Sequence, residues 1–345
     1  MTHFFIRSRL GLFRHTADGG FCKNRKGKIM IINEFRYEHI SGSDGLALSV
    51  LRMEPERSVK INGIVQLVHG MCEYKERYRD FMKYLVEHGY ICVIHDNRGH
   101  GESVKSKDDL GYLYEGGYEA LVEDIHEITG DTKEYVKDEF GEEKLPYILL
   151  GHSMGSLAVR CYIKKYDDEI DKLCVLGCPS EQKGAKAGLK VIQAMIKAKG
   201  AKSISKAADY LVMDSRLGKR FKAEGQSSWL NSDHEKVAEY IADPLCGFSF
   251  TLSGYEALIK LTLDTYDKNV DGYAMKNPEL KIKFFSGKDD PCAISYKDLR
   301  NAMLLLKHHG YKNISGKMYK GMRHEILNEP ENARVYKDIL EFIES

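Results

Sequence analysis

The chain has 345 residues, enough for one large domain with an insertion or for two modest domains. Hydrophobic residues make up 43% and charged residues 30%, a composition too apolar for an intrinsically disordered protein. The 52 Lys and Arg nearly balance 51 Asp and Glu, and the net charge of +1 predicts no nucleic-acid partner. Eight cysteines without a CxxC pair, and no apolar stretch of roughly 20 residues, predict free thiols and no transmembrane helix, hence a cytoplasmic protein.

The first 29 residues show no clear periodicity of apolar side chains. Met30 then begins a segment with the pattern of a domain start. We therefore predict that residues 1–29 are a disordered or non-native extension. Arg7 and Arg9 interrupt the apolar stretch at residues 4–13, so this stretch makes a poor signal sequence.

Strands and helices alternate after this extension. Residues 34–40 and 46–53 predict a β-hairpin around a glycine-rich turn. Short buried strands are predicted at 64–68, 90–95, 146–150, 172–177, 281–285 and 314–319. Amphipathic helices are predicted at 75–88, 115–138, 154–166, 294–307 and 331–344. This alternation is typical of an α/β fold with a mostly parallel sheet wrapped by helices.

Residues 181–275 interrupt the alternation. They are rich in Lys, Ala and Ser, have helical periodicity and contain no convincing buried strand. We predict that they form a helical cap inserted into an α/β core of residues 30–180 and 276–345. Such a cap would lie over the carboxyl edge of the sheet, where folds of this class bind ligands.

A candidate nucleophile follows the strand at 146–150, in the sequence Gly-His-Ser-Met-Gly. This G-x-S-x-G motif has the strand–turn–helix context that presents a serine on a sharp turn. We predict Ser153 as the nucleophile and the N–H of Met154, at the start of the helix, as one oxyanion donor. A glycine-rich turn with a chance serine is the alternative interpretation of the pentapeptide taken alone.

A serine hydroxyl needs a base, and after such a motif the acid and then the histidine follow along the chain. Three of the 13 histidines lie beyond residue 290. His308 and His309 fall in the last turn of a predicted helix, where a positive side chain complements the helix dipole. His324, between a strand and a helix, is the predicted base.

Two adjacent aspartates follow the strand at 281–285 and compete for the role of the acid. Pro291 favours an extended conformation at the residue before it. We therefore prefer Asp290 to Asp289 as the carboxylate that orients the histidine. Glu181, which follows the preceding strand, is a third candidate.

The second oxyanion donor is expected in the loop after the strand at 64–68, where Met71 follows His69 and Gly70. Its backbone N–H is the candidate. The chain has no H-E-x-x-H motif, Cys/His cluster, P-loop or post-strand G-x-G-x-x-G. We therefore expect no metal and no other cofactor.

With these residues placed, the chain from about residue 34 onward resembles the monoacylglycerol lipase / lysophospholipase branch of α/β-hydrolases, also described as serine aminopeptidase S33-like. The matching stretches lie at 69–78, 95–103, 151–156, 286–291 and 321–329. They contain the candidate nucleophile, acid and base in order, and they support Asp290. That branch typically has H-G-x-x-E-H in the oxyanion loop, and Tyr74 replaces the last histidine here.

The resemblance implies an α/β-hydrolase fold and a serine ester hydrolase. We predict cleavage of a small-molecule or lipid ester with a medium or long acyl chain, of the monoacylglycerol or lysophospholipid type, through a Ser-His-Asp triad and an acyl-enzyme. The alternatives are an aminopeptidase or amidase on the same triad and a non-catalytic binding protein. A cap carboxylate cluster for a substrate amine would favour the aminopeptidase, and Asp233, Glu235 and Glu239 are present. No obligate protein partner is implied.

One predicted cap helix has an apolar face and an opposite face that carries lysines. The apolar face is a candidate acyl-binding surface formed by Leu189, Ile192, Met195 and Ile196. A basic amphipathic helix is also suited to transient contact with an anionic membrane surface. The alternative is a helix that packs its apolar face inward and keeps its lysines in solvent.

Overall fold

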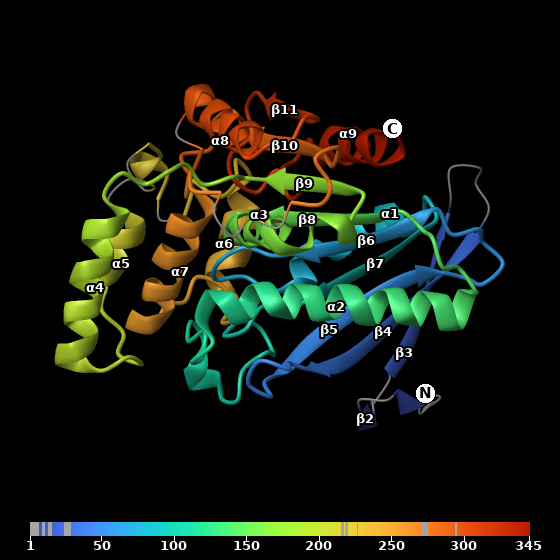
Figure 1. Cartoon of the computed structure of the whole chain (residues 1–345), viewed down its shortest axis with the longest axis horizontal. Helices are drawn as coiled ribbons and strands as arrows, with labels where there is room; N and C mark the ends of the chain where they lie inside the picture. The colour runs from blue at the N-terminus through green and yellow to red at the C-terminus, as the bar shows by residue number, and fades with distance from the viewer. Residues whose placement is uncertain are drawn as a thin grey trace.

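The computed structural model describes residues 7–8, 11–12, 16–23 and 29–345, apart from 215–216, 218–219, 226, 271–272, 274 and 294. In these residues nine strands form one sheet, in the order β11-β10-β9-β8-β6-β7-β5-β4-β3 (Figure 1). Six strands form its parallel part, namely β6 (Gly63–Val68), β7 (Tyr90–His95), β8 (Tyr147–His152), β9 (Lys172–Leu176), β10 (Lys281–Gly287) and β11 (Ile314–Tyr319). The predicted mostly parallel sheet is confirmed.

The other edge of the sheet is antiparallel. The predicted hairpin is present as β4 (Ile29–Ile40) and β5 (Ala47–Pro55), and β5 pairs with β7. The backbone of β3 (Thr16–Lys23) pairs with β4, and β1 (Arg7–Ser8) pairs with β2 (Gly11–Leu12) in a separate ribbon. That residues 1–29 are a disordered or non-native extension stays a prediction.

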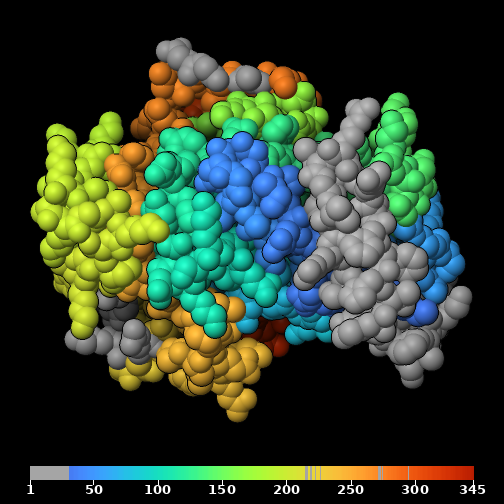
Figure 2. Space-filling model, turned by 90° about the horizontal axis from the view of Figure 1, so that it is seen from below, coloured from blue at the N-terminus to red at the C-terminus, as the bar shows by residue number. Residues whose placement is uncertain are grey.

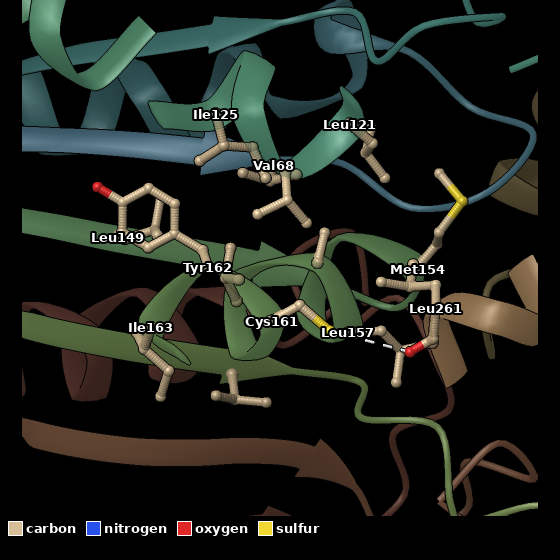
Figure 3. Close-up of a cluster of buried hydrophobic side chains, with 14 of the residues drawn as sticks. Val68, Leu121, Ile125, Leu149, Met154, Leu157, Cys161, Tyr162, Ile163 and Leu261 are labelled. Atoms are coloured by element: carbon tan, nitrogen blue, oxygen red, sulfur yellow. Dashed lines mark hydrogen bonds between the residues drawn. The ribbon is translucent and has the colours of Figure 1, made fainter. Parts of the chain in front are cut away.

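Helices cover both faces of the sheet because strand side chains alternate between two buried layers. In β8, Ile148 and Leu150 pack against α1 (Arg79–Val86) and α9 (Asn332–Glu344). Tyr147 and Leu149 face the opposite layer, with α2 (Gly117–Phe140), α3 (Met154–Tyr166) and α8 (Tyr296–His308). Figure 3 shows this second layer, where Leu149 from β8 meets side chains of α2 and α3.

The segment between β9 and β10 forms the helical cap. Its helices are α4 (Ala185–Lys199), α5 (Lys206–Asp209), α6 (His234–Ala242) and α7 (Leu252–Thr265), with a π-turn at Tyr210–Asp214 and a 3-10 turn at Lys222–Glu224. Among its described residues, the β-pairing is a single bridge between Ile204 and Thr251. Helix α4 lies at one end of the molecule in both overall views (Figures 1 and 2).

The predicted helix at 75–88 is divided in two. Lys75–Tyr78 form a 3-10 turn, and α1 begins at Arg79. The division follows from a tertiary contact, because Asp96 accepts hydrogen bonds from both the N–H (2.8 Å) and the ammonium group (2.7 Å) of Lys75. Two further 3-10 turns lie at Lys107–Asp109 and Asp167–Glu169. Among the helices described, none is long and apolar enough to cross a membrane.

Candidate active site

Ser153 lies on the turn between β8 and α3, at the carboxyl edge of the parallel strands. Its backbone has φ 53° and ψ −117°, a conformation that a residue with a side chain rarely adopts. The flanking glycines allow this turn, because a Cβ at Gly155 would lie 2.2 Å from the carbonyl oxygen of Val68 and one at Gly151 would lie 2.4 Å from that of Gly155. The Ser153 N–H donates to the Leu176 carbonyl at 3.0 Å, which fixes the turn against β9.

His324 and Asp290 lie on the loops after β11 and β10, two neighbouring strands. The Nδ1 atom of His324 is 2.9 Å from Oδ2 of Asp290, and both side chains are buried. The other carboxylate oxygen of Asp290 accepts the N–H of Cys292 at 2.8 Å. These contacts orient the carboxylate toward Nδ1, which then carries the ring proton and leaves Nε2 as the basic nitrogen.

The histidine loop and the serine turn lie side by side. The ring of His152, the residue before Ser153, is 4.7 Å from the ring of His324, and its Nε2 is 3.2 Å from the His324 carbonyl oxygen. Gly177 lies against both rings, since a Cβ there would be 3.0 Å from Nε2 of His152 and 3.2 Å from Cε1 of His324. The ring of Trp229, from the cap, is 5.0 Å from that of His324.

The alternative candidates lie elsewhere. Asp289 forms an ion pair with Arg220 and accepts the N–H of Gly321 at 3.2 Å. Glu181 and His308 line a surface cavity of about 440 Å³ beside α8. His309 hydrogen-bonds through Nε2 to the Asp267 carbonyl at 3.0 Å. Of the candidate acids and bases, the structure therefore brings together Asp290 and His324.

The candidate oxyanion loop follows β6 and approaches the serine turn closely. A Cβ at Gly70 would lie 3.0 Å from Cβ of Ser153, so Gly70 packs directly on Ser153. Met71 comes next in the chain, and the Met154 N–H begins α3, where an N–H has no intrahelical acceptor. Cys72 has φ 56°, a strained value, and its carbonyl accepts the N–H of Gly247 from the cap at 3.0 Å.

Sequence reasoning missed a buried network beneath these loops. One Glu73 oxygen accepts the N–H of Gly70 (2.7 Å) and the hydroxyl of Tyr78 (2.8 Å), and it lies 3.1 Å from Nδ1 of His152. The other Glu73 oxygen accepts a hydrogen bond from Arg77, which also pairs with both oxygens of Glu325 at 2.6 and 2.8 Å. The network thus connects the oxyanion loop, the serine turn and the histidine loop. The motif match at 69–78 contained Glu73 and Arg77, but their partners are distant in the chain.

Charge balance in this network is reflected in two pKa shifts. Burial alone would lower the pKa of His152, but its hydrogen bond with Glu73 and the charge of that carboxylate raise it above the usual value. Burial alone would raise the pKa of Glu73, but the hydrogen bond from His152 and the charge of Arg77 hold it well below its usual range. The two shifts have a common cause, because the protonated imidazole of His152 and the ionised carboxylate of Glu73 stabilise one another.

Tyr74, which replaces the histidine typical of the resembling branch, has a partner in the cap. Its hydroxyl donates to Asp243 at 2.8 Å. Burial and Asp243 raise the pKa of Tyr74, so the phenol remains a donor at neutral pH. The hydroxyl of Tyr240 donates to the carbonyl of Cys72 at 3.0 Å. The candidate oxyanion loop is therefore joined to the cap at Cys72 and Tyr74, which flank Glu73.

The four candidate acyl-binding residues lie where α4 packs on α7. Ile192 is fully buried, and the other three are partly buried against the same hydrophobic cluster, namely Leu189, Met195 and Ile196. This packing matches the alternative of an inward-facing apolar side. Their contact with substrate stays a prediction.

One three-residue group among the described residues has side chains suited to a metal. Ligand atoms of Asp290, Cys292 and His324 all lie within 4.8 Å of one another. Burial and the neighbouring Asp290 raise the pKa of Cys292 well above its usual value, so in the absence of a metal the Cys292 side chain is a thiol at neutral pH.

A mostly parallel sheet with a strained serine turn at its carboxyl edge, and a cap inserted before the last two strands, defines a serine hydrolase of the α/β-hydrolase fold. A family model described as "Serine aminopeptidase, S33" matches residues 59–331. The chain belongs to this family.

Known proteins similar to the chain agree with this assignment. A monoacylglycerol lipase of Mycolicibacterium smegmatis is 26% identical over 318 residues, which cover 91% of this chain and 99% of that protein. A monoglyceride lipase of Homo sapiens is 30% identical over 121 residues, 34% of each chain. Among solved structures, a thermostable carboxyl esterase from Bacillus coagulans has a TM-score of 0.79 at 22% identity, over 90% of this chain and 98% of its own.

Proposed function

We propose that this chain hydrolyses carboxylic esters with a medium or long acyl chain, of the monoacylglycerol or lysophospholipid type. Ser153 is the nucleophile, His324 the base and Asp290 the orienting carboxylate. The observation that carries the proposal is the buried Nδ1–Oδ2 hydrogen bond of 2.9 Å between His324 and Asp290, beside the strained turn at Ser153. The names of the relatives, monoacylglycerol and monoglyceride lipases, support the substrate class.

The proposed reaction follows from the tautomer that Asp290 selects. With the proton on Nδ1, Nε2 of His324 accepts the hydroxyl proton of Ser153 as its oxygen attacks the ester carbonyl. The N–H groups of Met71 and Met154 stabilise the resulting oxyanion. The imidazolium then protonates the leaving alcohol, and an acyl-enzyme forms. A water molecule, deprotonated by His324, attacks the acyl-enzyme and releases the fatty acid and free Ser153.

Two of the cap carboxylates considered for an aminopeptidase have local partners in the described part of the chain. Asp233 is the N-cap of α6 and accepts the N–H of Glu235 at 2.9 Å. Glu239 pairs with Lys236 at 2.8 Å on the same exposed helix. Both carboxylates are engaged within α6 itself, as a helix cap and as an i,i+3 ion pair, which does not favour a role in binding a substrate amine. The ester substrate is therefore the better supported of the two.

We further place the enzyme in the cytoplasm. The seven described cysteines are all free, as a reducing compartment requires. The lysine face of α4 is exposed, for example at Lys190 and Lys197, and it remains a candidate for transient contact with an anionic membrane. Binding of the protein to anionic but not zwitterionic vesicles, reduced by salt, would test this contact.

The test of the nucleophile uses a fluorophosphonate probe and a panel of p-nitrophenyl esters of graded length, with monoacylglycerol and lysophospholipid. Ser153→Ala should lose labelling and lower kcat by about 10⁴- to 10⁶-fold. Ser156→Ala, three residues further along α3, is the matched control and should still be labelled. Persistent labelling and turnover in Ser153→Ala would disprove the assignment.

A further inference from the structure

The loop after β10 carries a free thiol that the proposed reaction does not use. Cys292 follows Asp290 by two residues, and its N–H is the donor to the Asp290 carboxylate at 2.8 Å. Its carbonyl accepts the N–H of Ser180 at 2.9 Å, so the loop is fixed on both sides. Cys292 is half-buried, whereas Asp290 and His324 are buried. Of the three residues, Cys292 is therefore the most exposed to solvent.

The side chains of this group are the three kinds that bind zinc. Thiolate, imidazole and carboxylate bind it at about 2.3, 2.0–2.1 and 2.0–2.2 Å, which places ligand atoms roughly 3.3–3.7 Å apart in a tetrahedron. The corresponding atoms of Cys292, His324 and Asp290 lie within 4.8 Å of one another. Changes of about 1 Å, within the reach of side-chain rotation, convert this arrangement into a three-ligand site with one open position.

We propose that Asp290, Cys292 and His324 form a binding site for a thiophilic divalent cation of the zinc class, and that an ion bound there stops hydrolysis. The mixed sulfur, nitrogen and oxygen donors favour Zn²⁺ and Co²⁺ over Mg²⁺ and Ca²⁺, which prefer oxygen ligands alone. Binding itself is independent of the proposed function. The inhibition rests on it.

Inhibition follows from the nitrogen that faces the group. Nδ1 of His324 lies toward Asp290, so it is the nitrogen available to the ion. An ion on Nδ1 requires the other tautomer of the neutral ring, so the single ring proton moves from Nδ1 to Nε2, and the proton of the Cys292 thiol is released to solvent. The ring can no longer accept the proton of Ser153, and Asp290 no longer orients it. Resident zinc therefore opposes the hydrolytic reaction.

The binding experiment uses the Ser153→Ala protein, so that it does not depend on turnover. Titration with Co²⁺ should produce a near-ultraviolet thiolate-to-cobalt absorption band, and Zn²⁺ but not Mg²⁺ should abolish it. Cys292→Ala and the similarly sized Cys292→Ser should both lose the band and weaken Zn²⁺ binding by about tenfold or more. Cys246→Ala, a buried cysteine of the cap, is the control that should keep both. Melting temperatures verify that each variant is folded.

The inhibition experiment uses the enzyme with Ser153 intact. Zn²⁺ should inhibit ester hydrolysis, and a chelator should restore it. The rate of each variant is normalised to the rate of the same variant without Zn²⁺. Cys292→Ala should need about tenfold more Zn²⁺ for half-inhibition. A cobalt spectrum without a thiolate band, or Zn²⁺ affinity that is equal in the parent and in folded Cys292→Ala, would overturn the proposal. Absence of ester hydrolysis with an intact thiolate band would overturn the proposed function and leave the metal site standing.

Discussion

His152 and Ser153 are adjacent in the sequence but have opposite surroundings. Ser153 is partly exposed on a strained turn, whereas His152 is buried below it and contacts Glu73 and the carbonyl of His324. The strain at Ser153 needs a support that prevents the turn from relaxing. The contacts of His152 with Glu73 and with the His324 carbonyl provide that support, because a shift of the turn would break them.

The two adjacent aspartates of the β10 loop should differ sharply in their effect on catalysis. Asp290→Asn removes the anion that faces Nδ1 of His324 and permits the wrong tautomer, so kcat should fall by about 10³- to 10⁴-fold. Asp289→Asn loses a partly exposed pair with Arg220 and should change kcat less than about threefold. Steady-state kinetics on one soluble ester measure both effects. The reverse order would contradict the proposed acid.

Glu73→Gln tests the buried charge pair through its pH dependence. The pKa of His152 is raised in the folded protein, so the pair stabilises the fold fully below the unfolded value of about 6.5 and the stabilisation is lost as pH rises through the raised pKa. The variant should lose about 3–5 kcal/mol of unfolding free energy at pH 6 and less at pH 9.

Urea denaturation at the two pH values measures this difference. Glu143→Gln removes an exposed partner of Lys137 and serves as the control, with a loss below about 0.5 kcal/mol at either pH. A loss for Glu73→Gln that is equal at pH 6 and pH 9 would mean that His152 is neutral in the folded protein.

At the scale of elements, the sequence predicts the bounds of a helix or strand well when the pattern that indicates it lies within the segment itself. Helix α3 and strand β11 have the predicted bounds, because a short apolar run or a helical period is contained within the segment itself. The preference for Asp290 came from its neighbour Pro291. The Lys75–Asp96 and Arg77–Glu325 contacts join residues 21 and 248 positions apart, and no local pattern indicates them.

The packing of α4 on α7 predicts a stability effect for its apolar face. The side chain of Ile192 is completely buried, with 0% of its surface exposed. Ile192→Ala should therefore lower the free energy of unfolding by about 2–5 kcal/mol and lower the melting temperature. Val191→Ala, 49% exposed on the same helix, is the matched control and should cost less than about 0.5 kcal/mol.

Ester kinetics on the same two variants separate packing from substrate contact. Ile192→Ala should reduce the rate on short and long acyl esters to the same degree, because the cap as a whole loosens. A loss confined to long chains, with an unchanged melting temperature, would instead establish this face as the acyl-binding surface.

At the scale of the whole molecule, the cap holds the loops that carry the candidate site. Its segments contact the oxyanion loop through Tyr240 and Asp243, and they contact the histidine loop through Leu230, whose carbonyl accepts the N–H of Glu325 at 2.8 Å. Arg323, the residue before His324, donates to the Ser228 carbonyl. The cap therefore belongs to the architecture of the site, and its sequence had indicated only that it is helical.

Loss of the two tyrosine hydroxyls should detach the cap before the core unfolds. Trp229 is the single tryptophan and lies 5.0 Å from the ring of His324, so its fluorescence reports on the contact between cap and site. In wild type, urea transitions followed by fluorescence and by far-ultraviolet circular dichroism should coincide.

In Tyr74→Phe/Tyr240→Phe, two hydrogen bonds worth about 1 kcal/mol each are lost from the contact of the cap with the candidate oxyanion loop. The fluorescence transition should then precede the dichroism transition, and kcat should fall about tenfold because the loop beside Ser153 is no longer held. Tyr210, a residue that is 61% exposed, provides the control, because Tyr210→Phe removes a phenol elsewhere in the cap. Coincident transitions in the double variant, with unchanged kcat, would show that the cap is held without these contacts.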